Sequence, residues 1–573
     1  MIPQWVRTSP TMRVAMQACR RHLRFAALFS ALLNLLIVAP MLYMLQVYDR
    51  VLPTQGVATL LLLTLALVIA LGTMAVLEAI RSRLLVRAGL QLDRELSGLV
   101  MRASLRQTDG SRLSRQYLRE FDTLRQAMTG PAMHGLFDAP WVPIYTIVAF
   151  LIHPWIGVLS IAGTLLILAL AWRSENSTRA PLQQANAAAG RSYAIYDGSL
   201  QSADVARSLG MSEALVRGHL ADRNEMVGLQ YGAGMISARL TAESKFVRML
   251  LQSLALGLGA LLAVNGEVGA AAIFAASFIV GRALAPIDQL IGGWRTIVHA
   301  RASIDTLDEL LVQAPGPHAT TRMPKPEGRL DVEQLGVAGE TEKPILAAVS
   351  FRVAPGEVVA IVGPSGAGKS TLVRCLAGAQ VADVGFIRFD AAEQRDWDPA
   401  QLSSEVGFMP QETSLFAGSI KDNISRFEAR LGTNASDVDE AVIAAAMLAG
   451  AHEMILLLPG GYDHRLPVGG RGLSAGQAQR VALARALYRS PRYVLLDEPN
   501  ASLDAEGDAQ LTTTLEALKA AGTTVLVVAH RLSLLPVVDK ILVLRDGRVA
   551  LFGGRDEVIQ TLRRGPAQLA ANA

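Results

Sequence analysis

Long runs without charge dominate the first half of this chain and constrain what it can fold into. Val57 to Val76 holds about 20 residues without a charged side chain, the length of helix that crosses ~30 Å of hydrocarbon. Leu23 to Leu45 is a second such run, with Arg24 as its one charge, and only Tyr48 to Gly56 separates the two. Because apolar helices of this length are stable in a bilayer, the sequence predicts a tight transmembrane hairpin.

The first run also resembles a secretory signal peptide, because basic residues precede Leu23. It is, however, too long and too rich in Leu and Met, and no small-residue cleavage site follows it. We therefore interpret it as a retained first span.

Four more spans follow from the same criterion. Between Gln126 and Trp172 the only formal charge is Asp138, and the pair His153-Pro154 breaks the stretch near its middle. A Pro beside a polar residue is typical of a turn, so this stretch predicts spans three and four. Met249 to Val264 and Val268 to Ala285 give spans five and six.

The placement of charges predicts the orientation of the spans. The segments Arg81 to Arg125 and Arg173 to Arg248 are rich in arginine, whereas the short connections between paired spans hold only Arg50. Arginine and lysine concentrate on the cytosolic side of membrane proteins, so both long segments and both chain ends are predicted to be cytosolic. Few ionisable residues lie deep inside any span, which argues against a proton relay and indicates another energy source.

Composition indicates a membrane protein with a globular part. Hydrophobic residues make up 51% of the 573 residues and charged residues 18%, against a usual ~25% in soluble domains. These values exclude a disordered chain and argue against a wholly soluble enzyme. The net charge of +4 indicates no nucleic-acid partner. Cys19 and Cys375 form no paired framework and are expected to be reduced thiols without a role.

The chain is predicted to divide into four parts. They are a cytosolic N-terminal segment at 1–22, a transmembrane domain at 23–311, a linker at 312–328 and an α/β domain at 329–573. Within the transmembrane domain, Leu84 to Met128 and Leu182 to Lys245 repeat Leu, Ala and Arg at helical spacing. Helices are therefore expected to continue out of the membrane, to turn near Gly110 and Gly210, and to contact another domain at those tips.

The α/β domain carries a phosphate-binding loop. The apolar strand Val358 to Val362 runs into a sequence that matches G-x-x-x-x-G-K-[ST] between a strand and a helix. In this motif backbone N–H groups wrap phosphates, the lysine reaches the β- and γ-phosphates, and the hydroxyl can bind Mg²⁺. The loop residues are Gly363, Pro364, Ser365, Gly366, Ala367, Gly368, Lys369, Ser370 and Thr371.

Two adjacent carboxylates end another apolar strand of this domain. Tyr493 to Leu496 is followed by Asp497 and Glu498. At the carboxyl edge of a parallel sheet, Asp497 can complete a Mg²⁺ shell with Ser370. Because neighbouring side chains of a strand point in opposite directions, Glu498 is free to polarise a water for attack on a γ-phosphate.

A helix that begins near Ala478 has a strong start signal. Ser474 and Gln477 have the spacing of a capping box within Leu473-Ser-Ala-Gly-Gln477. With the phosphate loop and Asp497-Glu498, this segment resembles the ATP-binding-cassette (ABC) transporters, whose signature is L-S-G-G-Q, here with Ala475 in place of the first Gly. The resemblance implies a membrane all-α six-span exporter domain followed by an α/β P-loop ATPase domain. It also implies that Ser474, Gly476 and Gln477 bind the γ-phosphate of ATP held by the other subunit.

The resemblance implies three further site residues, which occur in the family order. Gln411, after the strand Val406 to Met409, matches the glutamine that senses Mg²⁺ and the attacking water. Asp504 matches the dimer-contact aspartate, and His530 matches the histidine that contacts the γ-phosphate. The aromatic residue that usually stacks on adenine is missing, because Val337 and Ala338 stand where it should fall.

Within the family, the membrane half resembles the type I secretion exporters of the protease-exporting branch. The matching segments are Gln46 to Thr54, Phe137 to Tyr145 and Asp497 to Asp504. This resemblance implies a homodimer in the bacterial inner membrane, with ATP and Mg²⁺ as cofactors and an unfolded secreted protein as cargo. It also implies two partners, a periplasmic adaptor (membrane fusion) protein and an outer-membrane channel.

Two other functions remain open from the sequence. An ABC exporter of lipids or drug-like molecules would share every ATP-site motif. A soluble, non-transport ABC ATPase is opposed by the six candidate spans. Only about 22 residues precede the first span, so the sequence predicts no N-terminal Cys-protease domain and an export substrate that is not trimmed.

Overall fold

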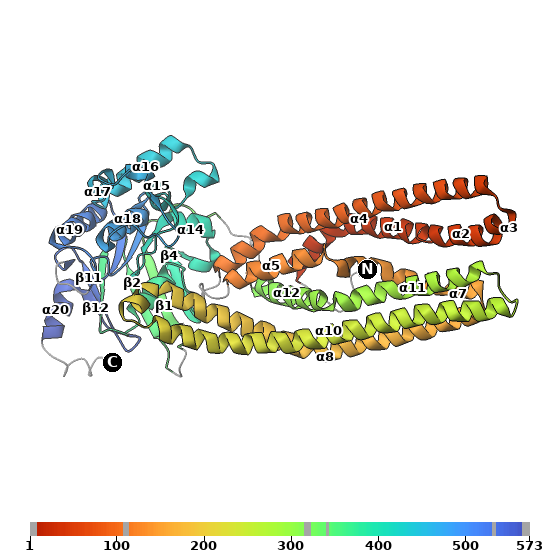
Figure 1. Cartoon of the computed structure of the whole chain (residues 1–573). Coiled ribbons are helices and arrows are strands. Elements are labelled where there is room, and N and C mark those ends of the chain that lie inside the picture. The colour runs from red at the N-terminus through yellow and green to blue at the C-terminus, as the bar shows by residue number, and fades with distance from the viewer. Residues whose placement is uncertain (1–8, 107–113, 314–321, 340–342, 530–533, 564–573) are drawn as a thin grey trace. The chain divides into compact units, whose positions relative to one another are not determined.

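The computed structural model describes residues 9–106, 114–313, 322–339, 343–529 and 534–563. It forms two compact units, Met1–Pro315 and Gly316–Ala573 (Figure 1). The division falls inside the 312–328 segment that the sequence analysis assigns to a linker.

The first unit consists of helices throughout its described residues (Figure 1). In chain order they are α1 (Pro10–Leu36), α2 (Ala39–Gln46), the π-helix η1 (Val47–Val51), α3 (Leu52–Thr54), α4 (Val57–Arg106), α5 (Ser114–Ala127), α6 (Pro131–Asp138), the 3₁₀ turn η2 (Ala139–Trp141), α7 (Val142–Ile152), α8 (Pro154–Gln201), α9 (Ala203–Ser208), α10 (Ser212–Val264), α11 (Ala271–Gly292) and α12 (Trp294–Gln313).

Six helical segments of this unit are long and apolar enough to cross a membrane, as predicted. They are Pro10–Thr54, Val57–Leu105, Pro131–Ile152, Pro154–Leu200, Ser212–Val264 and Ala271–Gly292. The predicted break at His153-Pro154 is confirmed, because His153 is extended and its Nδ1 accepts a hydrogen bond from the Trp155 N–H at 3.3 Å. Pro154 then starts α8, where its missing N–H costs no helical hydrogen bond.

Three helices are much longer than a membrane is thick. α4, α8 and α10 hold 50, 48 and 53 residues, about 70 to 80 Å at ~1.5 Å per residue. The prediction that helices continue beyond the bilayer is therefore confirmed. The predicted turn at Gly210, which has a φ of +66°, lies between α9 and α10. The turn predicted at Gly110 lies outside the described residues.

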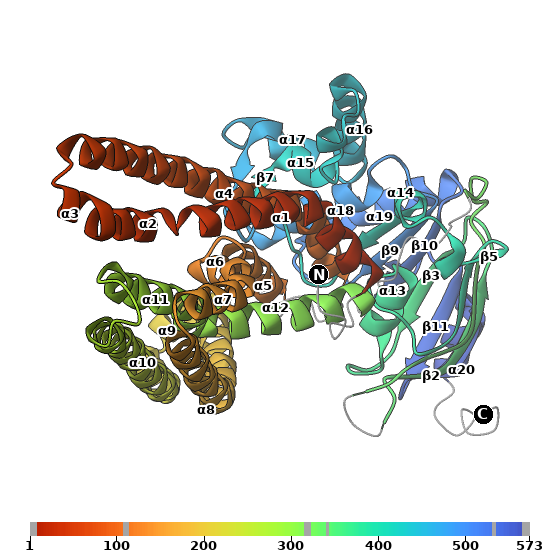
Figure 2. The same ribbon diagram turned by 90° about the vertical axis from the view of Figure 1, so that its right-hand side faces the viewer.

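Two helix pairs organise the first unit. α1 lies beside α4 and α8 lies beside α10 in both Figure 1 and Figure 2. α11 packs against α7, α8 and α10. At Gly259 of α10, an added Cβ would lie 3.0 Å from the Cα of Ile273 on α11. Small residues at such contacts let membrane helices approach closely.

The second unit is an α/β domain. Its strands are β1 (Leu330–Val337), β2 (Leu346–Val353), β3 (Val358–Val362), β4 (Val384–Phe389), β5 (Ala392–Glu393), β6 (Val406–Met409), β7 (Gly418–Ser419), β8 (Arg465–Leu466), β9 (Tyr493–Asp497), β10 (Thr524–Val528), β11 (Lys540–Arg545) and β12 (Arg548–Gly554). Its helices are α13 (Lys369–Leu376), α14 (Pro399–Glu405), α15 (Ile420–Ile424), α16 (Ala435–Leu448), α17 (His452–Leu456), α18 (Ala475–Leu487), α19 (Ala505–Ala520) and α20 (Arg555–Arg563), with 3₁₀ turns η3 (Gln394–Asp396), η4 (Glu428–Leu431) and η5 (Gly461–Asp463).

Two larger sheets and a short ribbon form the strand framework. The six-stranded sheet has the order β12-β11-β3-β10-β9-β6, and its strands are parallel except for the antiparallel pair β11 and β12. The four-stranded sheet, β2-β1-β4-β5, is antiparallel. β7 and β8 form the antiparallel ribbon.

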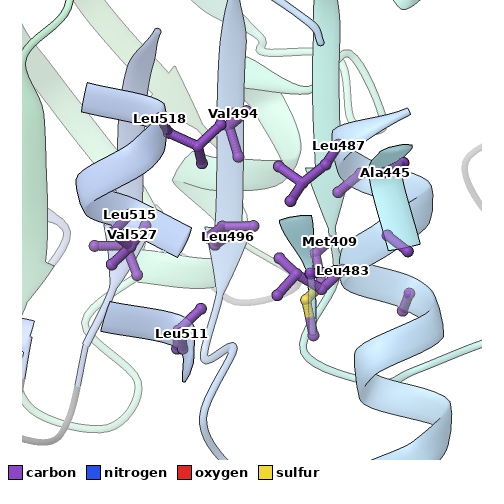
Figure 3. Close-up of a cluster of buried hydrophobic side chains, with 14 of the residues drawn as sticks. Met409, Ala445, Leu483, Leu487, Val494, Leu496, Leu511, Leu515, Leu518 and Val527 are labelled. Carbon is purple, nitrogen blue, oxygen red and sulfur yellow. The ribbon is translucent and has the colours of Figure 1, made fainter. Parts of the chain in front are cut away.

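Successive residues of the central strands enter two different cores. Val494 and Leu496 of β9 pack in one core, and Tyr493 and Leu495 pack in the other. Burial on both faces explains why these strands are continuous apolar runs. Figure 3 shows the first core between β9, β10 and the helices α18 and α19, with the labelled side chains Val494, Leu496, Val527, Leu483, Leu487, Leu511, Leu515 and Leu518.

One predicted boundary is wrong in a way that concerns the site. α18 begins at Ala475 rather than at Ala478. The reason is the capping box, in which the Gln477 N–H donates to Ser474 Oγ at 3.3 Å and the Ser474 N–H donates to Gln477 Oε1 at 2.9 Å. This pair closes the first helical turn directly after Ser474.

Candidate active site

The strand register gathers most of the predicted site residues at one edge of the parallel sheet. Ile361 of β3 pairs with Val528 of β10, and Val528 pairs with Asp497 at the end of β9. The carboxyl ends of parallel strands form the usual ligand-binding edge of such a sheet. Gly363 follows β3 by one residue, and Gln411 follows the neighbouring strand β6 by two and is exposed. His530 lies outside the described residues.

Two positions of the phosphate loop require glycine, because a Cβ there would collide with neighbouring atoms. An added Cβ at Gly363 would lie 2.2 Å from the Leu544 carbonyl oxygen. Gly368 has a φ of +94°, and its Cβ would lie 2.7 Å from Leu346 Cδ2. Only glycine fits these two positions, so the loop at the start of α13 keeps the tight backbone path of a phosphate-binding loop.

The Lys369 side chain folds back onto this loop. Its ammonium donates to the carbonyl oxygens of Gly363 and Pro364, both at 2.9 Å. The residue is only 6% exposed, so its charge is held at the loop rather than in solvent. Phosphate oxygens entering the loop can replace these two carbonyl acceptors and form stronger, charge-assisted bonds.

Ser370 and Asp497 meet beside the loop, as predicted for a Mg²⁺ site. Ser370 Oγ donates to Asp497 Oδ1 at 3.2 Å, and Asp497 is 1% exposed. Burial raises the pKa of Asp497, and the hydrogen bond from Ser370 opposes that rise. A buried carboxylate beside a hydroxyl matches the oxygen ligands that Mg²⁺ prefers, with phosphates and water completing the shell. The described residues contain no group of three or more His, Cys, Asp and Glu that could hold a metal ion.

Glu498 follows Asp497 in an uncommon backbone conformation. Its φ is +52°, in the left-handed region, which costs a residue with a Cβ about 1 kcal/mol or more. Its side chain is half-buried. Conformations of this kind persist where surrounding contacts fix them, and they occur often in active sites.

The contacts that fix Glu498 include a residue that the sequence analysis missed. Gln479 of α18 is 3% exposed; its Nε2 donates to the Glu498 carbonyl oxygen at 3.3 Å, and its Oε1 accepts from the Ser502 N–H at 3.0 Å. One side chain thus ties the signature helix to the segment after β9. The sequence did carry a signal for Gln479, because it is a polar amide on the buried face of a helix whose other buried residues are small or apolar.

The predicted signature and dimer-contact residues lie at helix starts. Ser474 caps α18 and is exposed, and an added Cβ at Gly476 would lie 3.1 Å from the Ser502 carbonyl oxygen. Asp504 caps α19, where its Oδ1 accepts from the Gly507 N–H at 2.8 Å. The Asp504 side chain is 66% exposed, so it can cap its own helix and still face a second molecule.

Of the two positions expected beside the adenine, the structure excludes Val337, whereas Ala338 is exposed. Val337 is 4% exposed and packs in a core, so it cannot contact a nucleotide. Ile345, whose N–H donates to the Val337 carbonyl oxygen at 2.8 Å, is 39% exposed. Its own carbonyl oxygen would lie 2.9 Å from a Cβ at Gly368. The backbone of Ile345 therefore lies next to the phosphate loop, a position that sequence spacing did not identify.

Both halves of the chain match known family models. Residues 23–282 match the ABC transporter transmembrane region, and residues 346–501 match the ABC transporter model. The type I secretion system ATP-binding protein PrsD of Rhizobium meliloti is 39% identical over 559 residues, covering 96% of this chain and 94% of that protein. The cyclolysin secretion/processing ATP-binding protein CyaB of Bordetella pertussis is 29% identical over 549 residues, covering 93% of this chain and 75% of the relative.

A solved structure extends the likeness to the whole fold. It is a bacterial Atm1-family ABC exporter with ATP bound, which superposes with a TM-score of 0.82 at 25% sequence identity. The superposition covers 96% of this chain and 98% of the exporter chain.

Proposed function

The chain belongs to the ABC transporters, among their type I secretion ATP-binding proteins, and on this basis we propose that a homodimer of it exports an unfolded polypeptide. ATP hydrolysis coupled to export is the activity of such proteins. The observation that carries the proposal is the Lys369, Ser370 and Asp497 cluster in a chain that also holds six candidate spans.

Two copies are needed to complete the proposed ATP site. One chain provides one phosphate loop and one signature helix, and the family places the signature of one subunit against the nucleotide of the other. In the dimer, Gly363–Thr371 of one copy and Ser474–Gln477 of its partner enclose one triphosphate. Closed twofold dimers are the commonest symmetric assembly. Asp504 is exposed at the start of α19 and is available for the dimer contact.

The proposed reaction is in-line hydrolysis of the γ-phosphate. Lys369 and the loop N–H groups bind and orient the phosphates, and Ser370, Asp497 and Gln411 are assigned to Mg²⁺, which neutralises charge on the leaving phosphates when bound. Glu498 accepts a proton from the attacking water as its oxygen bonds to the γ-phosphorus. The bond from that phosphorus to the β–γ bridging oxygen breaks, and ADP leaves. His530 is assigned to the γ-phosphate by the family pattern alone.

The setting of the dimer is also a proposal. The membrane unit is a multi-pass domain, and we assign it to the bacterial inner membrane with the ATPase unit in the cytosol. Type I secretion ATP-binding proteins work with an adaptor and an outer-membrane channel. We assign this chain one periplasmic adaptor and one outer-membrane channel as partners, so that its cargo crosses both membranes in one passage.

The proposal is tested by ATP hydrolysis of the full chain in lipid nanodiscs. We expect an unfolded polypeptide, such as reduced and alkylated lactalbumin, to change the hydrolysis rate, whereas added lipid or hydrophobic drugs leave it unchanged. As the matched control, the same polypeptide is added to the Lys369→Ala variant of the transporter, which lacks the phosphate-binding ammonium and should show no response. A response to lipids or drugs alone would instead identify an exporter of small amphiphiles.

A further inference from the structure

A second group of charged side chains lies in the membrane unit. Arg81 of α4 is 5% exposed, and its guanidinium donates to both Glu78 oxygens, at 2.8 and 2.6 Å. It also donates to Asp138 Oδ1 at 3.0 Å and to Ser30 Oγ of α1 at 2.9 Å. A cation buried at this depth is expensive unless it is paired, and two carboxylates satisfy Arg81.

The same group includes the segment Phe137 to Tyr145, which the sequence analysis used only as a family resemblance. Asn34 Nδ2 donates to Asp138 Oδ1 at 2.8 Å, and the Tyr145 hydroxyl donates to Asn34 Oδ1 at 2.7 Å. Asp138 is thus held from α1 and from α4 at once. The polar contacts join α1, α4, α6 and α7 into a fixed wall.

This wall borders a cavity of about 380 Å³ between α1, α4, α6 and α11. Its polar lining includes Asn34, Glu78, Arg81, His134, Asp138 and Arg282. The volume lies in the range of ligand sites, ~300–1,000 Å³, and exceeds the ~30 Å³ share of one liquid water about tenfold.

Arg282 enters the cavity from α11 with a guanidinium that pairs with none of the described carboxylates. Its guanidinium lies over the Phe278 ring, 5.5 Å from Cζ to the centroid, and is close enough to Tyr145 and Asp138 to interact with them electrostatically. Arg282 lies 11 residues into α11, which begins at Ala271 and is a candidate membrane span. An ionisable residue inside such a span marks a functional site by default.

Two more nitrogen atoms at the cavity lack an acceptor among the described residues. They are His134 Nε2 and Arg81 Nε, both buried. Glu78 and Asp138 pair with Arg81. Arg282 has no ion-pair partner among the described carboxylates, and its planar fork best fits a carboxylate.

We propose that this cavity binds acidic side chains of the exported polypeptide, with the carboxylate on Arg282 and a hydrogen bond from His134. The inference rests on the proposed polypeptide cargo. A chain that crosses the membrane domain carries Asp and Glu through a region of low dielectric, where an unpaired carboxylate is costly. One cation without an ion-pair partner among the described residues binds such a group and also releases it, as passage requires.

The test compares two labelled 20-residue peptides that differ only in having Glu or Gln at four positions. Binding to the full chain in nanodiscs is measured by fluorescence anisotropy. Wild type should bind the Glu peptide about fivefold more tightly, the effect of one partly solvated ion pair. Arg282→Gln should reduce this preference below about twofold. Arg239→Gln, a matched change at an arginine that is 77% exposed, should keep the full preference.

The outcomes separate this inference from the proposed function. Equal binding of both peptides by wild type, or an unchanged preference in Arg282→Gln, would overturn the carboxylate site while leaving stimulation by unfolded polypeptide intact. Loss of that stimulation in wild type would instead reject the polypeptide cargo. An effect of Arg282→Gln that appears only with anionic phospholipid in the nanodisc would assign the cavity to a lipid headgroup and overturn the proposal. If Arg282→Gln does not fold, Arg282→Lys should keep the Glu preference because it keeps the charge.

Discussion

Replacing Gln479 by Met tests whether the signature helix positions Glu498, the proposed general base. Methionine keeps the length and apolar body of the side chain, so the packing of α18 changes little. The substitution removes the donation to the Glu498 carbonyl oxygen and the acceptance from the Ser502 N–H, at 3.3 and 3.0 Å. The nucleotide contacts of the phosphate loop are untouched, so the change isolates the support of Glu498.

The structure sets the expected size of the effect. A hydrogen bond contributes a net ~1 kcal/mol, and an orphaned buried group costs ~1–3 kcal/mol. In the variant, the Glu498 carbonyl oxygen keeps a second donor, the Ala501 N–H at 3.2 Å, and Ser502 is exposed to water. The cost should therefore lie at the low end of this ~1–3 kcal/mol range. If ~1.5 kcal/mol of support for the Glu498 position is lost and the activation free energy rises by that amount, kcat falls about tenfold. KM for ATP should stay within about twofold, because binding does not use Glu498.

The assay is steady-state ATP hydrolysis by the full chain in nanodiscs, with the unfolding temperature measured in parallel. Gln510→Met is the matched control, because Gln510 is exposed on α19 and lines the same small hollow as Gln479. That control should change neither kcat nor KM. An unchanged kcat in Gln479→Met would refute the positioning role. A fall in kcat accompanied by an equal rise in KM and a lower unfolding temperature would show only a folding defect.

Three further changes have defined outcomes. Burial raises the pKa of Asp497, so its ionised form destabilises the nucleotide-free ATPase unit at neutral pH. Asp497→Asn should therefore raise the unfolding temperature at pH 7.5, and this gain should shrink at acid pH, where Asp497 of the parent becomes protonated. A gain that grows on acidification would contradict this prediction. Gly368→Ala should abolish binding of a fluorescent ATP analogue, because its Cβ would lie 2.7 Å from Leu346 in a left-handed backbone, and Gly366→Ala, with nothing within 4 Å, should lose less. Because the apolar Ile345 does not distinguish purines, GTP should be hydrolysed within about tenfold of ATP in kcat/KM, a gap of ~1.4 kcal/mol, and a hundredfold preference for ATP would show a base contact elsewhere.

Local patterns predicted most of the architecture. The uncharged runs identified all six candidate spans, and the helical repeat beyond them predicted helices longer than the bilayer, because both signals are set by neighbouring residues. The motifs at Lys369 and Asp497 predicted a joint site, since parallel strands bring their carboxyl ends to one edge. The structure places Ser370 and Asp497 within 3.2 Å although 127 residues separate them.

Contacts between distant segments were beyond the sequence. Gln479 is an ordinary helical glutamine until the fold brings it to Glu498 and Ser502. Val337 and Ala338 were expected near the adenine from spacing alone, but Val337 is buried in a core and only Ala338 is exposed. The contact between Arg81 and Asp138 could not be predicted, because 57 residues separate them and only packing brings them together.

The central claim, that two copies of this chain hydrolyse ATP with Glu498 as the base, is tested most directly by Glu498→Gln. The measurement combines ATP turnover with cross-linking of the two ATPase units in nanodiscs. We predict that turnover falls by ~10²–10⁴, the usual contribution of a general base, while ATP binding is retained and the ATPase units stay closed together with ATP. Near-normal hydrolysis by this variant, or units that do not close with bound ATP, would contradict the account.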